Sequence, residues 1–278
     1  MPKPAAAGSA KTHPWKCDLR LRHKFRLNTL AAMALQPDGR ILASLQPVVG
    51  GPGRVVRLMG GGSTDSSFGT NCFAFPTGGA GALEVLGNGD ILVFGGLVSR
   101  LTSSGALDTA FGVNGQLLAQ TGGHASAANG DILVAGVLVN DPMVPTTGLS
   151  AFAYHSVGIG DPAFGHNGGV MTAFPGFPTV SPSGMGLEST GDIVELGTVS
   201  TSTTGAFGLV RYTPLGQPDT SLGSGGIVTT SFGNNATVTA SAIAIQSDDK
   251  IVVAGTVSTV ALHGEFNTSV VVARYLAK

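Results

Sequence analysis

The feature that most constrains this chain is a short recurring motif of two apolar segments separated by a tight polar turn. The turn is centred on a glycine or an aspartate in five places: Gly39, Gly89, Gly130, Gly191 and Asp249. Gly, Asn and Asp tolerate the positive-φ conformations that a tight hairpin requires. Each copy therefore predicts a β-hairpin, and the variable spacing between copies indicates constant strands joined by loops of variable length.

A second pattern follows four of the five hairpins and reads Asp, two further residues, Phe or Leu, then Gly. The aspartate side chain is expected to accept hydrogen bonds from backbone N–H groups about two residues on. The apolar residue is expected to fill the gap between neighbouring units and to be buried there. The aspartates are Asp65, Asp108, Asp161 and Asp219, and the apolar residues are Phe68, Phe111, Phe164 and Leu222.

Units of about 40–60 residues that contain four strands have the size of a propeller blade. The sequence therefore predicts an all-β fold, a five-bladed β-propeller of four-stranded blades with little or no helix. The blades are expected at about residues 29–79, 80–120, 121–180, 181–239 and 240–278.

The fifth unit has no fourth strand of its own, and the N-terminal arm supplies a spare one. From Trp15 to Leu27 apolar and polar residues alternate, which is the period of a strand with one buried face. Residues 15–28 are expected to form a basic strand that pairs with the last blade and closes the ring. Closure would remove the free sheet edges. Residues 1–14 are expected to form a flexible tail.

Charge and hydropathy argue against several classes of protein. Residues 1–28 carry seven basic and one acidic side chain, and the remaining residues carry eight basic and fifteen acidic ones. Because the basic residues of the arm alternate with apolar ones, a solvated strand face on an acidic body is expected, and nucleic-acid binding is not. No apolar run reaches the roughly 18 residues of a transmembrane helix, and residues 1–25 contain no apolar segment typical of a signal peptide.

Several stretches resemble one known repeat. ALQPDGRIL, AIQSDDKIVVAG, LVRYTPLGQPDTSLGSGGIVTTSFG and VVARY are similar to the delta-60 repeat, an uncharacterised bacterial β-propeller repeat. The resemblance covers residues 29–278; the fourth and fifth units match it closely, and the first and third depart from it. It implies a propeller, an extracellular or cell-surface location and no catalytic residue. The absence of a signal peptide departs from this pattern and leaves a cytoplasmic location open.

The long connections are expected on one face of the propeller, where they join second to third strands and one blade to the next. Loops on a rigid scaffold are common binding sites. We therefore predict a non-catalytic interaction or structural module that binds a protein or glycan partner through this face. The connections are residues 45–53, 139–149, 171–184 and 256–268, and the candidate contact residues in them are Phe174, Phe177, His263, Glu265 and Phe266.

The alternative is a carbohydrate-active enzyme that uses carboxylates at the mouth of the channel. Glu84 and Glu188 lie on innermost strands with the same strand parity, so both side chains are able to face a channel. The competing interpretation is that they are structural residues of those strands.

Metal and cofactor sites are not expected, and the cysteines give little guidance. The histidines stand singly, without neighbours at ligand spacing, and no phosphate-binding or calcium-loop motif occurs. Cys17 and Cys72 are the only cysteines. A disulfide between them requires the arm to pack beside the first repeat, and two free thiols are the favoured expectation.

Overall fold

The computed structural model describes residues 28–47, 51–117, 119–126, 130–138, 148–260 and 266–276. The predicted tail, residues 1–14, and almost all of the predicted closing strand, residues 15–28, lie outside this range.

The described residues form nineteen strands in five antiparallel sheets, which we call sheets A to E, and they contain no helix. No segment among them qualifies as a membrane-spanning helix.

Sheet A comprises β1 (Asn28–Leu35), β2 (Ile41–Pro47), β3 (Arg54–Leu58) and β4 (Phe73–Ala74). Sheet B comprises β5 (Ala82–Val85), β6 (Ile91–Phe94), β7 (Val98–Leu101) and β8 (Gln116–Leu117). Sheet C comprises β9 (Ala119–Ser126), β10 (Ile132–Leu138), β11 (Gly148–Tyr154) and β12 (Gly169–Ala173). Sheet D comprises β13 (Thr179–Leu187), β14 (Ile193–Ser200), β15 (Gly205–Tyr212) and β16 (Ile227–Ser231). Sheet E comprises β17 (Ala236–Ile245), β18 (Ile251–Val260) and β19 (Phe266–Tyr275).

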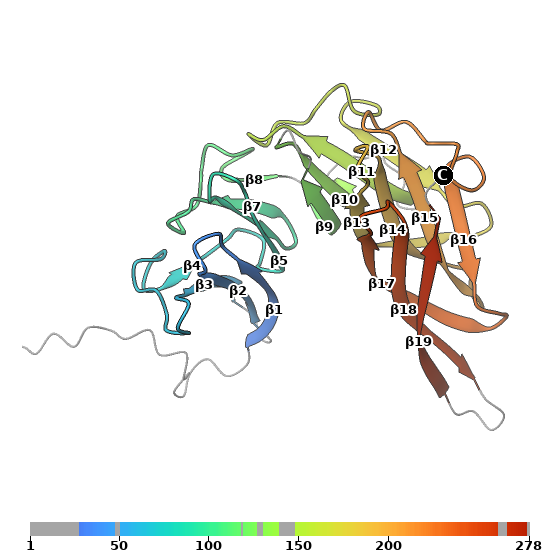
Figure 1. The fold of residues 1–278 in the computed structure, drawn as a ribbon, viewed down its shortest axis with the longest axis horizontal. Coiled ribbons are helices and arrows are strands. Elements are labelled where there is room, and N and C mark those ends of the chain that lie inside the picture. Colours follow the sequence, from blue (N-terminus) through green and yellow to red (C-terminus); the bar gives the residue numbers. More distant parts are fainter. Residues whose placement is uncertain are drawn as a thin grey trace, which may run out of the picture.

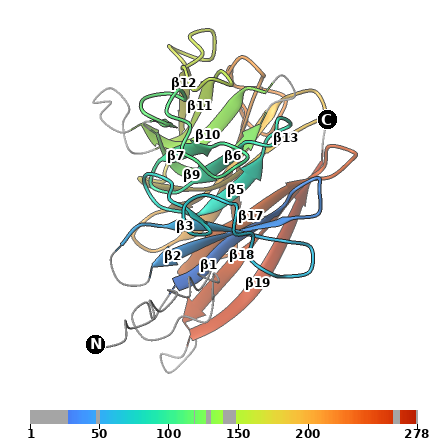
Figure 2. The ribbon, with the colours of Figure 1, turned by 90° about the vertical axis from the view of Figure 1, so that its left-hand side faces the viewer.

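Within each sheet the strands follow chain order, so every sheet is a meander of hairpins. The sheets succeed one another along an open arc, with the first strand of each on the inside of the arc and the last on the outside (Figure 1). Sheets A and E lie at the two ends of the arc. They overlap in the side view of Figure 2, but Figure 1 shows that they are well separated.

The predicted hairpin turns occur where the sequence placed them. Gly39, Gly89, Gly130 and Gly191 all have φ between +80° and +86°, and Asp249 takes φ +58° at the same place in sheet E. In the first hairpin the amide of Gly39 donates to the carbonyl of Gln36 over 2.9 Å. Residues able to adopt positive φ thus fix the register of every first hairpin.

A repeated contact joins each sheet to the next. Phe68, Phe111 and Phe164 are at most 1% exposed. Each ring lies against a positive-φ glycine in a turn of the following sheet. Ring atoms of Phe68, Phe111 and Phe164 lie 2.8–3.0 Å from the position that a Cβ would occupy on Gly105, Gly158 and Gly216 respectively. The ring therefore packs directly on a backbone that has no side chain, which confirms its predicted role as the filler between units.

The all-β prediction is confirmed for the described residues, whereas a closed ring is not observed among them. Sheet E has three strands, and no described strand pairs with the free edge of β19. Five blades in a closed ring, sealed by the arm, remain a prediction.

Replacing Phe164 by Ala should lower the free energy of unfolding by about 3–5 kcal/mol, because the ring fills the joint between sheets C and D. Urea unfolding followed by far-UV circular dichroism measures the change. Phe75, which is 46% exposed, provides the control; Phe75→Ala should cost less than about 1 kcal/mol. A loss below about 1 kcal/mol for Phe164→Ala would show that this joint does not stabilise the fold.

Candidate functional site

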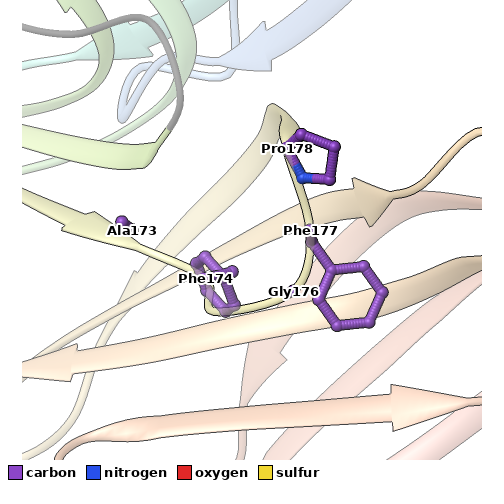
Figure 3. Close-up of a pocket in the computed structure, with 5 residues that line it drawn as sticks. All are labelled: Ala173, Phe174, Gly176, Phe177 and Pro178. Atoms are coloured by element: carbon purple, nitrogen blue, oxygen red, sulfur yellow. The ribbon is translucent and has the colours of Figure 1, made fainter.

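The connection between sheets C and D carries an open pocket on the loop face. Five consecutive or nearly consecutive residues line it: Ala173, Phe174, Gly176, Phe177 and Pro178. Its volume is about 470 Å³. Figure 3 shows the short loop turning between the two sheets, with the two phenylalanine rings pointing in different directions.

Phe174 is the anchor of this loop and is 3% exposed. Its ring packs across Gly208 of β15, where an added Cβ would lie 2.8 Å from a ring carbon. The loop itself is a tight turn, because the amide of Phe177 donates to the carbonyl of Phe174 over 3.0 Å and Gly176 has φ +85°. Burial of Phe174 thus fixes the loop and withdraws this ring from any partner.

Phe177 is half-buried against the same core, so part of its ring remains accessible together with Pro178. Of the other loop residues that the sequence singled out, Phe266 begins β19 and pairs with Val260 of β18. His263 and Glu265 lie outside the described residues. Of these residues, Phe174 and Phe177 are the ones whose described side chains lie together.

The sequence reasoning missed an arginine that accompanies each aspartate of the second motif in sheets A, B and D. The arginine stands eight residues before its aspartate, at the end of the third strand. Nε donates to the carboxylate over 2.9 Å for Arg57–Asp65, 2.7 Å for Arg100–Asp108 and 2.7 Å for Arg211–Asp219. The constant spacing of eight was the available signal.

Two of these arginines also link their sheet to the next. Nη1 of Arg57 donates to the Ser103 carbonyl of sheet B, and Nη1 of Arg100 donates to the Ser156 carbonyl of sheet C, each over 2.6 Å. The guanidinium groups also lie 4.6 Å and 4.5 Å from the ring centres of Phe68 and Phe111. The Arg–Asp pair is therefore part of the joint between sheets.

The two candidate catalytic carboxylates come from different sheets. Glu84 is on β5 of sheet B and is half-buried. Glu188 follows β13 of sheet D, is 7% exposed, and accepts two hydrogen bonds of 3.2 Å from Nη1 of Arg211. Burial raises the pKa of Glu188, and the bonds from Arg211 oppose this rise. Arg211 thus forms ion pairs with two carboxylates, the buried Glu188 and the partly exposed Asp219.

A second buried carboxylate, Glu195 on β14, was not anticipated. It is fully buried in the joint between sheets C and D, and no described group meets hydrogen-bond geometry at either carboxylate oxygen, although the backbone amide of Ser150 is near. Burial raises its pKa to about 8, although the backbone amide of Ser150 favours the charged form. The equivalent positions, four residues after the turn anchor, are apolar and buried: Ala43, Val93, Val134 and Val253. Only the tertiary environment marks Glu195 as unusual.

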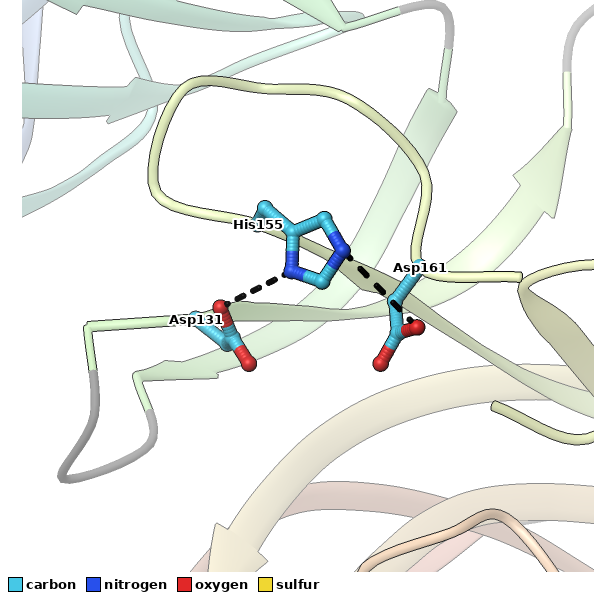
Figure 4. Close-up of side chains that lie close together, drawn as sticks. All are labelled: Asp131, His155 and Asp161. Carbon is cyan, nitrogen blue, oxygen red and sulfur yellow. Dashed lines mark hydrogen bonds and ion pairs between the residues drawn. The ribbon is translucent and has the colours of Figure 1, made fainter. Parts of the chain in front are cut away.

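Sheet C has an alanine, Ala153, where sheets A, B and D have the arginine, and His155 lies close to the aspartate instead (Figure 4). Nδ1 of His155 is 3.4 Å from Asp131 and Nε2 is 3.8 Å from Asp161. Asp131, His155 and Asp161 each offer one ligand atom, and these three atoms lie within 4.8 Å of one another, a spacing that a metal ion could bridge. Without an ion, the imidazole ring lies between the two carboxylates and bridges them.

Cys72 is disulfide-bonded, so the expectation of two free thiols is wrong. Cys72 has φ +70°, at a place where Gly115 and Gly168 stand in sheets B and C. The only other cysteine of the chain, Cys17, lies outside the described residues.

Neither a family model nor a curated protein matches this sequence. Solved structures match it at low similarity. A catalytically inactive virginiamycin B lyase from Staphylococcus aureus with quinupristin is 13% identical, with a TM-score of 0.43, over 87% of this chain and 70% of the lyase. YCF48 bound to D1 peptide is 12% identical, with a TM-score of 0.44, over 83% of this chain and 63% of that one. The polysaccharide lyase Uly1 is 13% identical, with a TM-score of 0.38, over 86% of this chain and 57% of that one.

This chain thus spans less than two thirds of YCF48 and of Uly1. Because every one of these TM-scores is below 0.5, the matches add nothing to the assignment of residues or activity. The fold assignment depends on the repeated sheets themselves.

Replacing Glu195 by Gln should change how stability depends on pH. The carboxyl ionises near pH 4.5 in the unfolded chain and near pH 8 in the folded one. Between these values the folded protein retains a proton that the unfolded chain has lost, so stability falls as pH rises. Each pKa unit corresponds to about 1.4 kcal/mol. The free energy of unfolding of Glu195→Gln, relative to that of the parent protein, should therefore increase from pH 4.5 to pH 8 and then level off.

Urea unfolding of both proteins at several pH values between 4 and 9 measures this difference. An advantage of Glu195→Gln that is the same at every pH would contradict the assignment.

Proposed function

We propose that this chain is a non-catalytic propeller-type module that binds a protein or glycan partner through the loop between sheets C and D. One observation carries the proposal. Phe177 and Pro178 border an open pocket on a loop that buried Phe174 holds in place. A partly exposed aromatic ring on a rigid loop gives contact area at little cost in conformational entropy.

The observations favour this role over the glycosidase alternative. A pair of catalytic carboxylates needs two groups about 5–10 Å apart at an accessible site. Glu188 is instead buried and held by Arg211, and such an ion pair is a common structural arrangement. Neither Glu84 nor Glu188 contributes to the pocket.

An extracellular or cell-surface location is part of the same proposal, as is membership of the delta-60 repeat family. The support for the extracellular or cell-surface location is the disulfide-bonded Cys72, because disulfides persist in oxidising compartments and are rare in the cytosol. The recurrent turn and Asp-x-x-Phe patterns support the repeat assignment.

The labelled protein should be applied to a glycan microarray and to an array of displayed peptides, and each ligand that it retains should be titrated. Phe177→Ala should weaken binding of such a ligand by tenfold or more, since loss of a central aromatic contact costs about 2 kcal/mol. Its melting temperature should stay close to that of the parent protein, since Phe174 still anchors the loop.

Phe75→Ala is the matched control, because Phe75 is an accessible aromatic residue on sheet A, at a distance from the pocket (46% exposed). It should bind with unchanged affinity. The proposal fails if neither array retains the parent protein, or if Phe177→Ala binds every ligand as well as the parent protein does.

A further inference from the structure

The two ends of the arc expose apolar side chains that are covered at every internal joint. On sheet A these are Leu30, Met33 and Leu35 of β1, which we call the leading face. On sheet E they are Val270 and Val272 of β19, which with Ala242 and Ala244 of β17 we call the trailing face. Exposed fractions reach 71% for Leu35 and 78% for Val270. Clustered exposure of this kind marks interaction surfaces.

The trailing face repeats a surface that the next sheet covers elsewhere. Val272 of β19 is 66% exposed, and the residues at the same place in the other four sheets are fully buried: Val55, Val98, Ala151 and Leu209. Val270 is 78% exposed, and its counterpart in sheet D, Phe207, is fully buried. Leu209 and Phe207 pack in one cluster with residues of sheet E. The trailing face is therefore a joint surface without its following sheet.

The leading face repeats, along β1, the surface that elsewhere packs on the preceding sheet; Ala43 of β2 and Val56 of β3, which lie on the same side of sheet A, are 7% and 2% exposed. Met33 is 57% exposed, whereas its counterpart in sheet D, Met185, is 7% exposed. Three counterparts of Leu35 pack into the cluster with the preceding sheet: Val85 in sheet B, Leu187 in sheet D and Ile245 in sheet E.

The internal joints show how these two surfaces would fit together. At the joint between sheets D and E, Ile243 and Ile245 lie on Gly184 and Gly186, with side-chain carbons 2.9 Å and 2.8 Å from where a Cβ would be. By position, Met33 and Leu35 correspond to Ile243 and Ile245, and Ala242 and Ala244 correspond to the two glycines. Met33 and Leu35 would then meet the Cβ atoms of Ala242 and Ala244, which the two glycines lack, so the ends of these flexible side chains must shift to fit.

A polar contact fits the same arrangement. Arg57 and Arg100 each donate to a turn carbonyl of the following sheet, that of Ser103 and that of Ser156. Arg274 holds their position in sheet E and is exposed. The turn residue of sheet A that corresponds to Ser103 is Gly60.

We propose that the trailing face of one chain binds the leading face of a second copy, in the geometry of the internal joints. A second copy is the occupant because the two faces of one chain lie at opposite ends of the open arc (Figure 1), and this assembly replaces the predicted closure of one chain by its N-terminal arm. The interface joins unlike surfaces, so copies joined through it form a closed ring where the rotation between them closes, of which a dimer is the smallest, and an open chain of copies where it does not. Arg274 then donates to the Gly60 carbonyl of the second copy.

Sedimentation velocity between 1 and 200 µM should show dimers of the full chain. Val272→Asp and Leu35→Asp should each raise the dissociation constant by roughly 100-fold or more, since each places a carboxylate in an apolar joint. Val270→Asp and Met33→Asp form a second pair should either of the first variants fail to fold, as judged by circular dichroism.

Mixing the two single variants gives the decisive result. Leu35→Asp retains an intact trailing face and Val272→Asp an intact leading face, so an equimolar mixture should form dimers through one undamaged interface. An interface between like surfaces would not be restored by mixing. Ile159→Asp, on a turn of sheet C at a residue that is 64% exposed, is the matched control and should dimerise as the parent protein does.

A parent protein that stays monomeric at 200 µM overturns the proposal. So does a dimer that neither variant weakens, or a mixture that remains monomeric. A monomer whose melting temperature falls in both variants would show that the two faces close within one chain, which also overturns it.

Discussion

The structure depends on the joint between successive sheets. A phenylalanine from one sheet packs on a positive-φ glycine of the next, as Phe111 does on Gly158. The same joint is held by an arginine that binds an aspartate of its own sheet and a carbonyl of the following one, as Arg100 does. Because a single sheet leaves its apolar faces uncovered, neighbours must stack to form a core, which is how repeat proteins gain stability.

This constraint separates the parts of the chain that are fixed from those that vary. The turn residue recurs in all five units, the apolar filler in four and the arginine with its aspartate in three, because packing and backbone conformation favour them. The connections on the loop face have no such requirement, and their length and sequence differ from one unit to the next. The loop around Phe177 has features of both parts. Phe174 is buried and holds the loop on the core, whereas Pro178 and the pocket face solvent. The same logic makes the two ends of the arc unusual, since they retain joint surfaces that no further described sheet covers.

The candidate site was foreseen only in part. The sequence pointed to Phe174 and Phe177 together because both stand in a long connection among prolines, but only packing against Gly208 shows that Phe174 is an anchor. Glu188 had been considered for a channel, and its bonds come from Arg211 on β15 of the same sheet, 23 residues further along the chain. Glu195 was overlooked because nothing adjacent to it distinguishes a buried glutamate from an exposed one.

The sequence by itself determined the hairpins, the antiparallel order of strands within each unit and the apolar filler between units. These follow from local rules, namely which residues accept positive φ and how apolar positions alternate along a strand. Only the tertiary structure decided the open curvature of the described sheets, the burial of Phe174 and Glu195, the arginine bonds to carbonyls of the following sheet and the exposure of the leading and trailing faces. Each of these depends on which sheet lies against which, and that depends on the sum of many contacts between residues remote in sequence.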